Sequence, residues 1–230
     1  MSRRDSESPR TSRNDASRLA ADKARALALI PVSRETEARL DNFVDCLLRW
    51  QKTTNLVSQA TVDELWTRHI ADSLQLLALS PDARVWIDLG SGAGFPGLVI
   101  ACALAGRQGS MVHLVESNGK KAAFLREAIR ITGAPAKLHA VRIEAFNPPA
   151  HADVVTSRAL APLEKLIGYA YPLLKSGAVG LFPKGQDVEA ELTAASKCWT
   201  ISAESVPSKM TPEGRIVIVR HAEPISAEPA

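Results

Sequence analysis

The residues from Asp88 to Gly97 combine one carboxylate with four glycines, at positions 90, 92, 94 and 97. A strand-like apolar run precedes them at 84–88, and a helix-like run follows at 96–105. Glycine lets the backbone adopt positive φ and lets a ligand approach the main chain closely. A strand, a glycine-rich turn and a helix in this order predict a nucleotide-type pocket, with Gly90 and Gly92 beside the ligand.

Two ligands each fit part of this pattern. The run from Gly92 to Gly97 matches G-x-G-x-x-G, and Glu116 follows at roughly the 20-residue spacing of a dinucleotide fold, which favours NAD. However, Asp88 would face the crevice where a pyrophosphate lies, and Pro96 has no N–H to donate to a phosphate. S-adenosylmethionine (SAM) has no phosphate and carries an ammonium and a sulfonium, which suit an acidic pocket. Glu116 would then accept both ribose hydroxyls. The sequence therefore favours SAM over NAD.

Three later strand ends carry further candidates at the same edge of the sheet. Arg142, Ile143 and Glu144 follow the third strand. The backbone groups of Ile143 and Glu144 are placed to read an adenine edge, and the alternative is a surface ion pair between Arg142 and Glu144. Arg158 follows the fourth strand, where it either binds a ligand carboxylate or a substrate phosphate or caps a helix. Lys184 ends the fifth strand and either meets RNA phosphate or caps a turn.

His69 and Asp72 lie one turn apart on one face of an expected helix. They either hold the structure together or dock the N-terminal helices over the pocket, close to the substrate. The run Asn147–Ala150 resembles the Asn-Pro-Pro-aromatic motif of adenine-N6 methyltransferases, but it precedes the fourth strand and ends in alanine. We interpret it as a turn.

Composition sets further limits. The 230 residues are 46% hydrophobic and 23% charged, which suits one core of ordinary size. Residues 1–34 carry eight basic and four acidic side chains, and the rest of the chain carries 20 and 21. Charge alone is therefore weak evidence for nucleic-acid binding. The three cysteines are far apart and form no metal or disulfide spacing. We expect a cytoplasmic monomer with no metal site and no membrane segment.

Periodicity predicts a strand-helix alternation after an all-helical start. Leu40, Phe43, Val44, Leu47 and Leu48 mark one apolar helix face behind the candidate N-cap Ser33, and Thr61–Glu64 is a capping box for another helix that ends before Pro81. The expected helices lie at 20–30, 33–50, 61–80, 96–105, 118–131, 161–174 and 186–197, and the expected strands at 84–88, 110–115, 136–141, 152–156, 177–182, 199–205 and 215–221. The last strand has no crossover helix before it and is expected to insert antiparallel. This is an α/β fold with a seven-stranded, mostly parallel, Rossmann-like sheet, as in class I SAM-dependent methyltransferases, and an N-terminal helical extension.

Four segments follow from this pattern. Residues 1–16 are expected to form a disordered basic arm, and residues 17–80 are expected to form helices packed on the core. Residues 81–221 are expected to form the SAM-binding methyltransferase core, and residues 222–230 are expected to form a disordered tail.

Taken together, these residues resemble the GidB/RsmG family, the small-subunit rRNA (guanine-N7) methyltransferases. The resemblance spans about residues 40–220. It is carried by these landmarks: Trp50 to Leu56, His69 to Leu74, Asp88 to Gly97, Leu114 to Ser117, Lys120-Lys121, Phe124-Leu125, Arg142 to Glu144, Ser157 to Ala159 and Lys184-Gly185.

The resemblance implies methylation of a guanine N7 in the decoding-site (530) loop of 16S rRNA, guanine 527 in the family's usual rRNA numbering. The substrate would be 16S rRNA or a precursor of the small ribosomal subunit. The resemblance also implies that Gly90, Phe95, Ile143, Glu144 and Arg158 contact SAM. Guanine N7 carries an in-plane lone pair and no proton, so no general base is expected, and Arg158 would act by positioning.

Three other functions remain open at this point. A class I methyltransferase for a small molecule or a protein would need a closed substrate site, for which the N-terminal helices could serve as a lid. An NAD-dependent oxidoreductase would show a nicotinamide absorbance change. A non-catalytic RNA-binding protein could also keep this fold.

Overall fold

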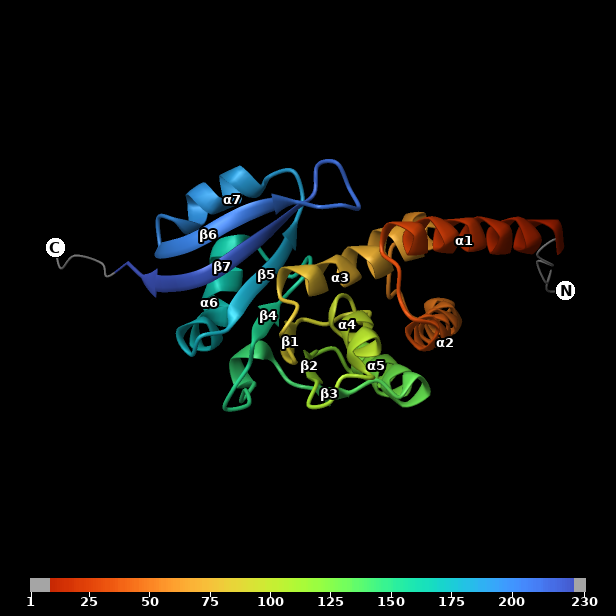
Figure 1. The fold of residues 1–230 in the computed structure, drawn as a ribbon, viewed down its shortest axis with the longest axis horizontal. Coiled ribbons are helices and arrows are strands. Elements are labelled where there is room, and N and C mark those ends of the chain that lie inside the picture. Colours follow the sequence, from red (N-terminus) through yellow and green to blue (C-terminus); the bar gives the residue numbers. More distant parts are fainter. Residues whose placement is uncertain (1–8, 226–230) are drawn as a thin grey trace, which may run out of the picture.

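A computed structural model describes residues 9–225 and has a seven-stranded sheet at its centre (Figure 1). The strands are β1 (Val85–Leu89), β2 (Met111–Val115), β3 (Ala136–His139), β4 (Val154–Thr156), β5 (Val179–Lys184), β6 (Trp199–Pro207) and β7 (Arg215–Pro224). Their order is β3-β2-β1-β4-β5-β7-β6. The pairs among β1 to β5 are parallel, whereas β7 pairs antiparallel with β5 and β6. The predicted fold class and the antiparallel insertion of the last strand are both confirmed.

Helices cover both faces of the sheet. The helices α4 (Gly97–Leu104) and α5 (Gly119–Thr132) pack on one face, and α6 (Leu163–Lys175) and α7 (Val188–Ala195) pack on the other. Alternate residues along a strand point to opposite faces of the sheet. Trp86 therefore belongs to the hydrophobic core under α4 and α5, and Ile87 belongs to the core under α6 and α7. Burial on both faces explains why the strands read as continuous apolar runs.

The N-terminal helices extend the first layer. They comprise α1 (Pro9–Leu29), α2 (Arg34–Gln51), the 3₁₀ segment η1 (Gln59–Glu64), the π-helical segment η2 (Trp66–Ala71), α3 (Asp72–Leu74) and the 3₁₀ segment η3 (Gln75–Leu79). The Ser33 hydroxyl accepts a hydrogen bond from the Thr36 amide, which confirms the predicted N-cap of α2. Figure 1 shows α1 and α2 at one end of the molecule and the β6–β7 hairpin at the other, with α3 between them.

The segment from 59 to 79 corrects the prediction of one helix. Its four short pieces include a π-helical turn, and Thr61 caps nothing, because its hydroxyl donates to the Ser58 carbonyl at 2.9 Å. Instead, the buried Asp22 of α1 accepts hydrogen bonds from the backbone amides of Trp66 at 2.8 Å and Thr67 at 3.1 Å. This bond from a distant helix satisfies amides that an isolated helix start would leave unpaired.

The chain ends also differ from the sequence-based boundaries. Helix α1 begins at Pro9, within the arm that was predicted to be disordered to residue 16, and β7 continues to Pro224, within the predicted tail. Residues 1–8 and 226–230 lie outside the described part of the chain. Within residues 9–225, no helix is both long and apolar enough to cross a membrane.

Candidate functional site

The glycine-rich turn after β1 has the backbone that its sequence predicts. Gly90, Gly92 and Gly94 have φ of 74°, 56° and 88°, a region that side chains other than glycine rarely adopt. A Cβ built on Gly90 would also lie 2.8 Å from Cδ1 of Leu160, so a side chain there would meet the loop after β4. The turn therefore needs glycine mainly for its backbone conformation, since the exposed Leu160 side chain could move aside.

Most amides of the turn are already hydrogen-bonded within the protein. Gly90 and Ser91 donate to the Val115 carbonyl, Gly92 donates to Glu116, and Gly94 donates to the Ser91 carbonyl. A pyrophosphate-binding turn would instead direct such amides at the ligand. The arrangement thus disfavours a dinucleotide.

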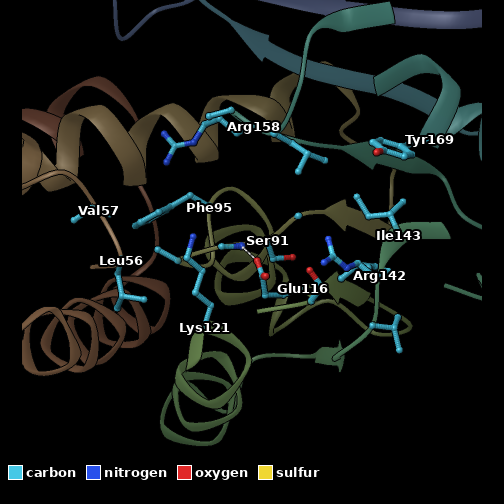
Figure 2. A pocket seen from close by; sticks show the side chains of 18 of the residues that line it. Leu56, Val57, Ser91, Phe95, Glu116, Lys121, Arg142, Ile143, Arg158 and Tyr169 are labelled. Carbon is cyan, nitrogen blue, oxygen red and sulfur yellow. Dashed lines mark hydrogen bonds between the residues drawn. The ribbon is translucent and has the colours of Figure 1, made fainter. Parts of the chain in front are cut away.

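Glu116 follows β2 and lies directly beside this turn. Its Oε2 accepts the Gly92 amide at 2.8 Å and its Oε1 accepts the Asn118 amide at 2.7 Å. The carboxylate still lines the cavity described below (Figure 2). Because each carboxylate oxygen can accept more than one hydrogen bond, Glu116 retains acceptor capacity for ligand hydroxyls.

Asp88 does not take the position that the sequence suggested. Its side chain is fully buried and absent from the cavity wall, and Oδ2 accepts the Gly97 amide at 3.1 Å at the start of α4. Burial raises the pKa of Asp88 to about 7. The expectation that Asp88 faces the crevice is therefore wrong; this carboxylate anchors α4.

A cavity of about 580 Å³ lies over the turn (Figure 2). It brings together seven of the eight predicted cofactor residues: Gly90, Gly92, Phe95, Glu116, Ile143, Glu144 and Arg158. Ile143 and Glu144 belong to the 3₁₀ turn η4 (Ile143–Ala145) after β3. The sequence analysis missed wall residues such as Leu56, Val57, Lys121 and Tyr169. Leu56 and Lys121 belong to the landmarks of the family resemblance, whereas Tyr169 gave no local signal, because it belongs to the amphipathic α6.

Arg158 joins the predicted pair His69 and Asp72 into one cluster. Its Nη2 lies 2.7 Å from His69 Nδ1, and its Nη1 lies 3.4 Å from Asp72 Oδ2 and 3.2 Å from the Arg68 carbonyl oxygen. The guanidinium carbon also lies 5.1 Å from the ring centre of Phe95, on which His69 stacks at 4.9 Å. The His69–Asp72 pair therefore ties the N-terminal segment to the loop after β4.

The pKa values of this cluster follow from burial and charge. Burial, reinforced by the neighbouring Arg158, lowers the pKa of His69 to about 3. Burial raises the pKa of Asp72, while the Arg158 guanidinium opposes that shift. At neutral pH the cluster thus holds a neutral imidazole against a cation.

A second cavity of about 700 Å³ adjoins the first and shares His69, Arg158, Ala159 and Leu160 with it. Lys184 lies in its wall, but its Nζ is bonded to Glu191 Oε2 at 2.6 Å and to the Ala161 carbonyl at 2.9 Å. Ala159, between the two cavities, has φ of 53°, which is unusual for alanine. Two cavities meeting at one cation suit a bound cofactor and a separate substrate.

Comparison with known proteins identifies the family. The family model described as GidB, rRNA small subunit methyltransferase G, matches residues 36–217. The chain belongs to this family. The match confirms the resemblance predicted from the sequence. It runs from the start of α2 into β7 and thus includes both cavities, whereas α1 lies before it.

Relatives in the GidB family are close in sequence. A ribosomal RNA small subunit methyltransferase G from Bradyrhizobium sp. (strain BTAi1) is 60% identical over 205 residues, covering 87% of this chain and 91% of the relative. The protein of the same description from Rhodopseudomonas palustris (strain BisB18) is 57% identical over 208 residues, covering 90% and 89%.

Solved structures share the fold of this GidB protein at low identity. An O-methyltransferase from Bacillus cereus in complex with SAH has a TM-score of 0.54 at 18% identity, over 89% of this chain and 99% of that one. A putative O-methyltransferase from Klebsiella pneumoniae has a TM-score of 0.54 at 14% identity, over 90% and 99%. These likenesses confirm the class I methyltransferase fold.

Proposed function

We propose that this protein uses SAM to methylate N7 of a guanine in the decoding-site loop of 16S rRNA, guanine 527 in the family's numbering. The observation that carries the proposal is the meeting of two cavities at Arg158 and Leu160 in a member of the methyltransferase G family. The first cavity would hold SAM and the second would receive the target nucleotide. An rRNA substrate also implies a cytoplasmic enzyme, and we expect a monomer.

The first cavity fits SAM on several grounds. Its volume of about 580 Å³ lies within the range of small-molecule sites. Glu116 offers acceptors for vicinal ribose hydroxyls, and the turn amides are too fully bonded to receive a pyrophosphate. The residues that would hold SAM are Gly90, Gly92, Phe95, Glu116, Ile143, Glu144 and Arg158.

SAM would supply the activated methyl group, and the residues of this chain would position the methyl group against the target nucleotide. Arg158 is held by His69, Asp72 and the Arg68 carbonyl, so its cation has a fixed place between the two cavities. These three bonds leave two of its five N–H groups for cofactor or target. Because guanine N7 has no proton to lose, alignment of the reactants is the main catalytic contribution.

The second cavity has cations that could pair with a phosphate. Arg68 and Arg215 belong to its wall, together with the acidic Asp72, Asp187 and Glu191. Arg68 is half exposed and lies 3.6 Å from Glu64. An exposed arginine can pair with a phosphate bidentately, while a flipped base would enter between these cations and Arg158. The two arginines support an RNA substrate, because its phosphates bind cationic side chains.

Two measurements test the proposal. Calorimetry with the purified protein should show SAM binding and no measurable NAD binding. Mass-spectrometric mapping of rRNA from cells with and without the protein should show 7-methylguanine in the decoding-site loop only when the protein is present. An unchanged rRNA modification pattern, or NAD binding in place of SAM, would refute it.

A further inference from the structure

Gln75 occupies an unusual position behind the second cavity. It begins η3, is 5% exposed, and uses both ends of its amide. Its Nε2 donates to Asp72 Oδ1 at 2.7 Å, to the Asp72 carbonyl at 3.1 Å and to Ser208 Oγ at 3.1 Å. Its Oε1 accepts the Lys209 amide at 2.9 Å. One buried side chain therefore joins the N-terminal segment to residues more than 130 positions later.

The partner segment is the loop from Ser208 to Gly214, which we call the β6–β7 loop. Ser208, Thr211 and Gly214 line the second cavity together with Arg215, the first residue of β7. The loop is closed by the Ser208 amide, which donates to the Gly214 carbonyl at 2.9 Å. It thus forms the wall of the second cavity on the side of the hairpin.

The other end of the link reaches the cation between the cavities. Asp72 Oδ1 accepts from Gln75, and Asp72 Oδ2 faces Arg158 Nη1. Any shift of the Gln75 amide would therefore act on both the loop and the Asp72–Arg158 pair. Leaving a buried polar group unpaired costs free energy, so the Gln75 amide holds Asp72, Ser208 and Lys209 in place through these hydrogen bonds.

We propose that Gln75 is a positioning residue for the target nucleotide, because it holds the β6–β7 loop and the Asp72–Arg158 pair in one fixed arrangement. Its role for the nucleotide rests on the proposed function. Its role in ordering the loop does not. Gln75 touches neither cavity, so it acts only through these partners.

The test compares full-length variants. Gln75→Leu removes all the hydrogen bonds at similar size. Gln75→Glu keeps an acceptor for the Lys209 amide but removes the donors to Asp72 and Ser208. Gln59→Leu, an exposed glutamine of η1 that lines neither cavity, is the matched control.

Limited trypsin digestion measures the loop without any activity assay. Lys209 is exposed and lies within the β6–β7 loop, so mass spectrometry can follow cleavage between Lys209 and Met210. We expect Gln75→Leu to be cut there about tenfold faster than the wild type, Gln75→Glu to be intermediate, and the control to be unchanged. A wild-type cleavage rate in Gln75→Leu would overturn the tether.

Kinetics then separate positioning from general stability. Both Gln75 variants should raise the KM for the RNA substrate by about tenfold, and SAM affinity should fall by less than that, because Gln75 reaches the first cavity only through Asp72 and Arg158. A purely structural residue would instead weaken SAM binding at least as much as RNA binding, and that result, or an unchanged KM, would overturn the positioning role. If the wild type methylates no guanine, the proposed function fails, while the trypsin result still decides the tether.

Discussion

The guanidinium of Arg158 lies 2.7 Å from Nδ1 of His69. A guanidinium can only donate, so Nδ1 must accept and the ring proton lies on Nε2, which is 3.1 Å from the Thr61 hydroxyl. The same hydroxyl donates to the Ser58 carbonyl. This chain of bonds fixes one neutral tautomer, in agreement with the pKa of His69 being lowered to about 3 by burial and by Arg158.

The first prediction concerns pH and stability. As pH falls below about 6.5, the unfolded chain protonates this histidine and the folded chain does not, so the free energy of unfolding decreases, by at most about 1.4 kcal/mol per pH unit. The contribution is fully present above that pH. His69→Asn keeps an acceptor for Arg158 but cannot titrate. Between pH 7 and pH 5, urea unfolding should therefore show a smaller loss in the free energy of unfolding for His69→Asn than for the wild type. Equal losses would contradict the assignment of His69 as neutral in the folded protein.

Arg158→Ala should reduce methyl transfer by roughly 100-fold, because misplacement of the reactants by about 1 Å costs that much. Folded protein should remain, and single-turnover rates on that fraction measure the effect. The matched control is Arg220→Ala, which removes an exposed pair with Glu204 on the outer hairpin and should change little. Wild-type rates in the folded fraction of Arg158→Ala would make this arginine purely structural.

Glu116→Ala should weaken SAM binding by about 1.5–3 kcal/mol, the range for a lost charge-assisted hydrogen bond. The loss has two sources, since the carboxylate would both accept ribose hydroxyls and hold the Gly92 amide. Calorimetry measures it, with Glu189→Gln on the exposed side of α7 as the control. An unchanged affinity would remove Glu116 from the site.

Lys184 should behave as a structural residue more than as an RNA contact. Its ammonium is largely buried against Glu191, whose Oε2 also accepts the Leu163 amide at 2.6 Å. Lys184→Ala and Glu191→Ala should each lower stability, and the double variant should lose less than the sum. The salt dependence of RNA binding should change little for Lys184→Ala. A shallower salt dependence of RNA binding with unchanged stability would instead support a contact between Lys184 and an RNA phosphate.

The sheet and the cofactor side of the site were predictable because their signals are local. Buried strands, positive-φ glycines and an acid at the end of the second strand are visible in the sequence. The inward direction of the Asp88 side chain could also have been predicted, because alternation along β1 places it on the same face as Trp86, toward α4.

The rest depends on contacts between distant residues. The broken helix from 59 to 79 is tied to Asp22, the His69–Asp72 pair is completed by Arg158, and the β6–β7 loop is held by Gln75. No local sequence pattern predicts such long-range hydrogen bonds.

The most direct test of the central claim is the chemical identity of the product. Purified protein, labelled SAM and small-subunit RNA or particles should give 7-methylguanine in the decoding-site loop, and replacing the target by 7-deazaguanine should abolish transfer. Since guanine N7 needs no general base, the single-turnover rate should be nearly flat from about pH 8 to 9, above the range in which the buried Asp88 that anchors α4 titrates. A methyl group on cytosine C5 or adenine N6, or transfer to the 7-deaza substrate, would contradict the account.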